Sequence, residues 1–213
     1  KGVHNREIRT LFCIDQTTMP FANEKEYKKL LADYGTAEER GQGEGDDRAM
    51  HVRFNDFLLK MRDNLVPIRT DGSGVAHYDT EKDAVYMPRQ KDFEHYNDYV
   101  QETLRQIVSA TGHQQRLARE GMVMKNGTAP SEDAIKRERL VAELASGVKM
   151  LELGLPARLS EEGLHLTDYW VRELKENPCL IDAVESDVNN ALLVMRKAEQ
   201  GEKIEYSTMR NQR

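Results

Sequence analysis

Cysteine is scarce in this sequence, which contains only Cys13 and Cys179 among its 213 residues. The two lie far apart and form no C-x-x-C pair, which excludes a disulfide framework and a cysteine-based zinc knuckle. No apolar run approaches the roughly 18 residues that a membrane-spanning helix needs. These absences predict a cytoplasmic protein that works in a reducing compartment and has no membrane partner.

Basic charge is also in short supply. The chain has 31 Lys and Arg against 37 Asp and Glu, for a net charge of -6. Sequence-independent DNA binding needs a basic surface that releases counterions, so we expect weak or no nucleic-acid binding by this chain alone. For two short basic clusters, a solvated helix face is a better interpretation than a phosphate site: Arg116, Arg119 and Lys125, and Lys136, Arg137 and Arg139.

Motifs for nucleotide binding and serine hydrolysis are missing as well. No glycine-rich phosphate loop follows a predicted strand, and no G-x-S-x-G elbow occurs. The histidines His77, His95 and His113 are scattered, and a lone histidine is more often a surface or core group than a ligand. We therefore expect no metal site rebuilt from these histidines.

Hydrophobic periodicity predicts short strands in the first half and helices in the second. The segment 35–47 is rich in glycine and acids, which predicts a mobile loop. Asp46 or Asp47 is then expected to cap the next helix, whose apolar face includes Phe54, Phe57 and Met61. The expected strands are 8–14, 66–68, 75–78 and 84–87, and the expected helices are 24–34, 47–64, 92–112, 131–153, 167–175 and 181–199.

The segment Thr103–Leu117 combines a helical pattern with a polar motif. Val100, Leu104 and Ile107 recur on one side, which predicts an amphipathic helix. We expect it to end at Gly112, where a positive φ can close the last turn. The next helix is expected to bury Leu140, Val141, Leu144, Val148 and Leu151, and the last one Val184, Val188, Ala191, Leu192 and Met195.

This segment resembles the T-L-H-E-x-x-H-x-T-G-H-x-x-R-L signature of the zincin-like metallopeptidase domain found in ArdC-type antirestriction proteins and phage polyvalent proteins. Three flanking segments match the family in the same order: 76–88 with Phe93, 138–144, and 11–17. The resemblance spans most of residues 11–155. It implies an α+β fold with a small antiparallel sheet, in which a hairpin packs against several helices, and a helical C-terminal half.

The resemblance also implies a domain organisation. We expect a single zincin-like domain over 1–213, with a core at about 8–155, a helical extension at about 156–200 and a frayed tail at 201–213. In the family, contact with single-stranded DNA belongs to an N-terminal domain that this chain lacks. The chain begins at Lys1 rather than at Met, so a fragment of a longer protein stays open as an interpretation.

In the family, two histidines one helical turn apart bind zinc and a glutamate acts as general base. In this sequence Arg105 and Ser109 stand at the two histidine positions, and Gln106 stands at the position of the glutamate. Arg105 is permanently cationic, Gln106 does not titrate near neutral pH and a Ser109 hydroxyl is a weak zinc ligand. The resemblance therefore predicts a degenerate metallopeptidase, with no catalytic residue, no metal and no cofactor.

The family keeps its acidic third ligand on the helix that here contains Glu138 and Glu143, and the sequence leaves both open. We hypothesise that the Arg105 guanidinium replaces the metal and pairs with one of these carboxylates. The alternative is that Arg105 extends to water and the acids lie on an exposed face. His113, the last histidine of the motif, is expected to shape the helix end without a catalytic role.

The function predicted from this resemblance is an inactive metallopeptidase-like protein of a mobile genetic element that binds an unknown protein or peptide as an antirestriction-related factor. An edge strand such as Ala84–Met87 is the expected docking element, because it can pair with an extended segment. One alternative is a DNA-associated antirestriction factor that acts with the missing N-terminal domain. A second alternative is a hydrolase with a relocated site.

Overall fold

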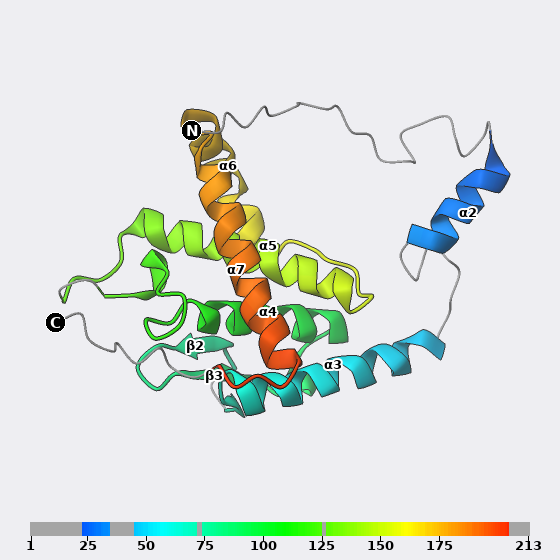
Figure 1. Ribbon diagram of the computed structural model, residues 1–213, viewed down its shortest axis with the longest axis horizontal. Coiled ribbons are helices and arrows are strands. Elements are labelled where there is room, and N and C mark those ends of the chain that lie inside the picture. The colour runs from blue at the N-terminus through cyan, green and yellow to red at the C-terminus, as the bar shows by residue number, and fades with distance from the viewer. Residues whose placement is uncertain (1–22, 35–44, 72–73, 125–126, 205–213) are drawn as a thin grey trace. The chain divides into compact units, whose positions relative to one another are not determined.

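The computed structural model describes residues 23–34, 45–71, 74–124 and 127–204 (Figure 1). The chain divides into two units, Lys1–Asp46 and Asp47–Arg213. The first unit holds helix α2 (Glu24–Tyr34), which has the predicted bounds. The predicted strand 8–14 and most of the predicted loop lie outside the described residues. Among the described helices, none combines the length and apolar character that crossing a membrane requires.

The second unit contains a three-stranded mixed sheet made of β1 (Ile68–Thr70), β2 (His77–Asp79) and β3 (Ala84–Met87). Their order is β1-β3-β2, with β3 antiparallel to β2 and parallel to β1. The predicted hairpin is confirmed. The expectation that Ala84–Met87 is an edge strand is wrong, because β1 pairs with its second side. Because β1 runs parallel to β3, the sheet is mixed rather than wholly antiparallel as expected, and its edge strands within the described residues are β1 and β2.

Five helices follow or precede this sheet: α3 (Gly45–Asn64), α4 (Tyr96–Thr111), α5 (Glu132–Glu152), α6 (Glu161–Glu176) and α7 (Leu180–Glu199). Two 3-10 turns, η2 (Gln90–Asp92) and η3 (Glu120–Met122), lie in the connections. Helix α4 contacts β2 and β3, and it also contacts α5 and α7 (Figure 1). The α+β class with a helical C-terminal half is thereby confirmed.

The core forms where α3, α4, α5 and α7 bring their apolar faces together. Phe54, Phe57 and Met61 of α3 are fully buried, as predicted, and so is the predicted face of α7. On α5, Leu140 and Val141 are buried, but the prediction fails for the residues that follow them. Leu144, Val148 and Leu151 are 43%, 38% and 59% exposed.

Polar side chains explain the failed prediction on α5. Glu138, Glu143, Ser146 and Lys149 are buried on this helix, so its inward face is only partly apolar. The apolar stripe from Leu144 to Leu151 points to water instead. Burial of a charged group requires a partner, and each of these charged residues has one, as described below.

The starts of two helices depart from the predictions. Helix α3 begins at Gly45, which puts Asp46 and Asp47 inside its first turn rather than at its cap. Helix α6 begins at Glu161, six residues before the predicted start, because Ser160 caps it by accepting a hydrogen bond from the Gly163 N–H. Helix α5 starts within a residue of the predicted position, where the Ser131 hydroxyl caps it by accepting a hydrogen bond from the Ala134 N–H.

Helix α4 ends at Thr111 with Gly112 as its C-cap, but the predicted positive φ is wrong. Gly112 has φ −80°, which other residues adopt without strain. The glycine is needed for space instead, since a Cβ at this position would lie 2.8 Å from Nη2 of Arg119 and 2.8 Å from Cγ of Met122. The buried Arg119 side chain thus passes directly over the end of α4.

Candidate functional site

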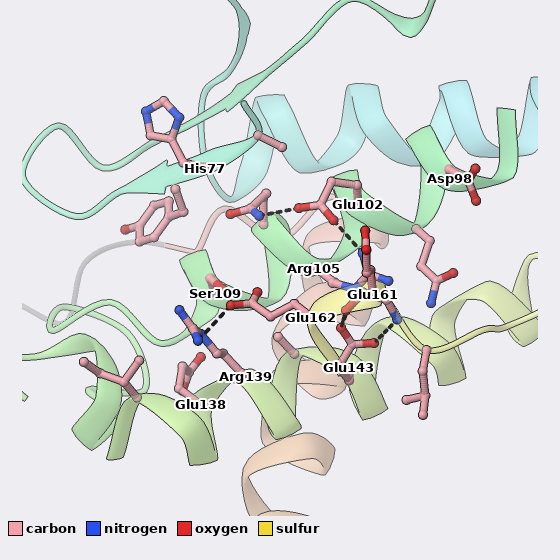
Figure 2. Close-up of a pocket in the computed structure, with 18 of the residues that line it drawn as sticks. His77, Asp98, Glu102, Arg105, Ser109, Glu138, Arg139, Glu143, Glu161 and Glu162 are labelled. Atoms are coloured by element: carbon pink, nitrogen blue, oxygen red, sulfur yellow. Dashed lines mark hydrogen bonds and ion pairs between the residues drawn. The ribbon is translucent and has the colours of Figure 1, made fainter. Parts of the chain in front are cut away.

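A cavity of about 820 Å³ opens among α4, β2, α5 and the start of α6 (Figure 2). The residues expected at the site that line it are Arg105, Gln106, Ser109, Glu138 and Glu143. His113 does not line it. The helical spacing of Glu102, Arg105, Gln106 and Ser109 explains the α4 wall, because residues three and four apart share one face of a helix.

Arg105 lies between two carboxylates, one from its own helix and one from α5. Its Nη1 donates a hydrogen bond to Oε2 of Glu102 at 2.5 Å, and its Nε lies 2.9 Å from Oε1 of Glu143. The second contact is an ion pair without hydrogen-bond geometry, since Nε finds no aligned acceptor among the described residues. Arg105 therefore ties α4 to α5 from inside the cavity (Figure 2).

Glu143 also holds the start of α6. The Ser160 N–H donates to Oε2 of Glu143 at 3.1 Å, and the Ser160 hydroxyl donates to Oε1. The Gly163 N–H then donates to the Ser160 oxygen at 2.8 Å. With its side chain only 5% exposed, Glu143 has a cation and two hydrogen-bond donors around it. One carboxylate thus joins three helices.

Glu138, the other candidate acid, pairs with a different arginine. Nε and Nη2 of Arg119 donate to its two oxygens at 2.8 and 2.6 Å. The same guanidinium donates to Oγ1 of Thr111 and to the backbone oxygen of Val108. Burial raises the pKa of Glu138 above its ordinary value, and Arg119 opposes that shift. This bidentate pair ties the end of α4 to α5.

The last part of the motif holds the hairpin against α4. Nε2 of His113 lies 3.2 Å from the backbone oxygen of Thr80, in the β2–β3 turn. Arg116 donates to both oxygens of Asp83 at 2.8 Å, and also to the backbone oxygens of Ala110 and Leu65. These contacts support a structural role for His113, outside the cavity.

Tyr78 completes this group. Its hydroxyl donates to Oδ1 of Asp83 at 2.6 Å. Burial and the neighbouring Asp83 carboxylate raise the pKa of Tyr78 above its ordinary value. Tyr78 therefore stays a neutral hydrogen-bond donor across the physiological range of pH.

The residues around Arg105 do not fit a divalent metal. Zinc takes imidazole, thiolate or carboxylate ligands, whereas the three motif positions on α4 offer the guanidinium of Arg105, the amide of Gln106 and the hydroxyl of Ser109. The amide of Gln106 donates to Oε1 of Glu102 at 2.7 Å. Glu138 and Glu143 of α5 are already paired with Arg119 and Arg105. Among the described residues, no group of three His, Cys, Asp or Glu side chains is placed to hold a metal.

The two basic clusters do not form a free phosphate site in the described part of the chain. Arg116 and Arg119 are buried against Asp83 and Glu138. Lys136 pairs with Glu132 and lies over the Tyr169 ring. Arg137 and Arg139 pair with Asp187 and Glu162. Lys125 lies outside the described residues.

Sequence reasoning missed several residues that build the site, namely Glu102, Arg119, Asp83 and Ser160. Glu102 and Ser160 carried recognisable signals. Glu102 lies three residues before Arg105, and Ser160 precedes two acids at a helix start. Arg119 and Asp83 gave no such signal, since their partners are 19 and 33 residues away.

Residues 59–185, more than half of the chain, match the sequence model of a family described as zincin-like metallopeptidase, MPTase-PolyVal. Among curated proteins, none matches the chain.

Two solved structures have a similar fold. They are the Mn(II)-bound and metal-free structures of the antirestriction protein ArdC from the R388 plasmid, each with a TM-score of 0.59 and 21% identity. The alignments cover 69% and 70% of this chain, and 52% and 51% of those chains. The chain thus spans about half the length of these structures.

Proposed function

The chain belongs to the zincin-like metallopeptidase family, and we propose that it is a non-catalytic member whose cleft binds an extended segment of another protein. The observation that carries this proposal is the ion pair between Arg105 and Glu143. A cation of the protein itself neutralises the acid that faces the motif helix, at the position where the family pattern has a histidine.

Loss of hydrolysis follows from the chemistry of these side chains. Gln106 cannot take a proton from water, and its amide is engaged with Glu102. Arg105 repels a divalent cation and cannot be deprotonated in a protein. A relocated metal-dependent site has little support, because the described residues hold no group of three side chains that could bind a metal.

The cavity and the β2 strand beside it support a binding role. The cavity of about 820 Å³ is large enough for part of a peptide. Ala76, His77 and Tyr78 line it, and within the described sheet β2 pairs only with β3. An extended segment can add to such a strand through backbone hydrogen bonds. This replaces β3, the strand expected from the sequence, as the docking element.

The similarity to ArdC supports a second, narrower proposal, that the protein is an antirestriction-related accessory factor of a mobile genetic element. That similarity is one of fold at 21% identity. A role through DNA has less support, since the net charge is -6 and the described arginines of the two basic clusters are paired with acids.

The test of the proposal is a zinc titration by calorimetry together with a protease assay on an unfolded protein substrate. We expect neither zinc binding at micromolar concentration nor cleavage by the natural chain. The triple variant Arg105→His, Gln106→Glu and Ser109→His should bind zinc, and adding Glu143→Gln should weaken that binding. Zinc-dependent cleavage by the natural chain would overturn the proposal.

The DNA-associated alternative has its own measurement. Affinity for a single-stranded oligothymidine at 50 and 200 mM salt reports how many phosphates the chain neutralises. We expect weak binding at both concentrations. Tight binding that falls steeply with salt would favour the DNA-associated role over the peptide-binding role.

A further inference from the structure

The wall of the cavity carries more carboxylates than guanidiniums. Its three arginines are Arg105, Arg139 and Arg158. Its six acids are Asp98, Glu102, Glu138, Glu143, Glu161 and Glu162. This excess of negative charge lies in a concave region, where field lines from like charges are focused.

Ion pairs within the protein cancel only part of that excess. Arg119 neutralises Glu138 from behind the wall, and Arg139 pairs with Glu162. Glu102 and Glu143 share the single charge of Arg105. These groups together leave one negative charge uncompensated.

Two further acids on the wall have no cationic partner among the described residues, Asp98 and Glu161. Asp98 lies one helical turn before Glu102 on α4, and Glu161 is the first residue of α6 (Figure 2). Arg158 is the wall's one arginine without an acidic partner in the described chain. Even with its charge counted, the cavity retains a surplus of negative charge.

The β2 edge, which no other described strand covers, and the acidic wall belong to the same cavity. Ala76, His77 and Tyr78 bring the β2 edge to one side, and Asp98 and Glu161 come from the α4 and α6 sides. A segment paired with β2 projects alternate side chains to opposite faces of the sheet. A long basic side chain can reach the acidic wall while its backbone stays at the edge.

We infer that the cavity selects an extended peptide segment with an arginine or lysine, whose cationic group binds against Asp98 and Glu161. The inference rests on the proposed function, because it names the chemistry of the segment that the cleft binds. An acidic segment is disfavoured, since two of the wall's three arginines already have acidic partners. The overall charge of -6 adds to the attraction for a basic segment.

The test uses the full chain and three pools of capped, fluorescent heptapeptides. Their central residue is arginine, its neutral isostere citrulline, or glutamate, and their flanks are randomised among alanine, valine, serine and threonine. Fluorescence anisotropy should show the arginine pool binding severalfold more tightly than the citrulline pool. The double variant Asp98→Asn/Glu161→Gln should weaken arginine binding roughly fivefold and leave citrulline binding unchanged.

The matched control is Asp168→Asn/Glu185→Gln, which removes the same charge from exposed positions outside the cavity. It should leave the arginine preference intact, and thermal unfolding should show that both variants fold. If both double variants lose the same affinity for the arginine pool, the preference reflects overall charge, and the inference is overturned.

The remaining outcomes separate the inference from the proposed function. If all three pools bind with one affinity, or if glutamate is preferred, the inference fails and peptide binding stands. If no pool binds, the proposed function fails and the inference fails with it.

Discussion

Arg105 and Glu143 face each other with side chains only 13% and 5% exposed. A buried carboxylate without a partner is costly, so each buried acid of this site needs a cation close to it. The Arg105 guanidinium supplies that cation for Glu143. The same logic applies to Glu138, which Arg119 neutralises. At the residue scale, each of these two buried acids is matched by an arginine.

This matching predicts strong coupling between Arg105 and Glu143. Arg105→Met and Glu143→Gln should each lower the free energy of unfolding by roughly 2–3 kcal/mol, because each leaves a buried group without its partner. The double variant should be more stable than the sum of the two losses by about 1 kcal/mol or more. Urea unfolding measures all four proteins.

A control cycle on Arg62 and Asp63 uses a pair whose side chains are 52% and 60% exposed. Its coupling should lie within measurement error, because solvent screens such pairs. Strictly additive losses for Arg105→Met and Glu143→Gln would show that their contact contributes nothing.

At the scale of elements, the ends and faces of the helices depend on neighbours. The C-cap of α4 is Gly112 because a larger residue would overlap Arg119 and Met122. Helix α5 buries Glu138, Glu143 and Lys149 along with its apolar residues, which leaves Leu144, Val148 and Leu151 exposed. Lys149 pairs with Glu199 of α7 at 2.7 Å. The side chains that a helix buries therefore depend on the residues of the neighbouring helices that contact it.

Two glycine-to-alanine variants test this interpretation of Gly112. Gly112→Ala should destabilise the fold by roughly 1–3 kcal/mol, because its Cβ would overlap Arg119 and Met122 in a packed region. Gly147→Ala, inside α5, should stabilise it by about 0.5–1 kcal/mol, since its Cβ would meet only Ala157 at 3.7 Å. Thermal unfolding compares the two, and similar effects would contradict the crowding argument.

At the scale of the molecule, polar contacts join the sheet to the helical layer. Arg116 connects Asp83 of the hairpin with the backbone of Ala110 and Leu65. Tyr78 donates to the same carboxylate. The hairpin is thereby fixed against α4, which holds the β2 edge at the mouth of the cavity.

Two buried tyrosines, Tyr78 and Tyr96, predict a loss of stability at alkaline pH. Burial raises the pKa of Tyr96 to about 12 and also raises that of Tyr78. Because both values are higher in the folded chain, the stabilisation is fully present below the unfolded value of about 10 and is lost as pH rises toward 12. Urea unfolding between pH 8 and pH 11 should show the fall.

Phenylalanine variants separate the two tyrosines. Tyr96→Phe should keep its stability at pH 8, because the buried hydroxyl finds no hydrogen-bond partner among the described residues. Tyr78→Phe should lose about 1–2 kcal/mol there, since it removes the bond to Asp83. Both should flatten the alkaline slope, and an unchanged slope in both would refute the assignment.

The sequence by itself determined the local features of this protein. Helical periodicity predicted α4, α5 and α7 within a few residues, and two short strand patterns close together in the chain, with the family resemblance, predicted the β2–β3 hairpin. The order of four motifs indicated the zincin-like family. Such signals are readable because they depend on residues close together in the chain.

Only the tertiary structure decided which distant residues meet. It paired Glu143 with Arg105 and Glu138 with Arg119, between which the sequence could not choose. It also put β3 in the middle of the sheet and the Leu144–Leu151 stripe in water. A charge or an apolar side chain finds its surroundings through packing between elements, and no local pattern specifies those contacts.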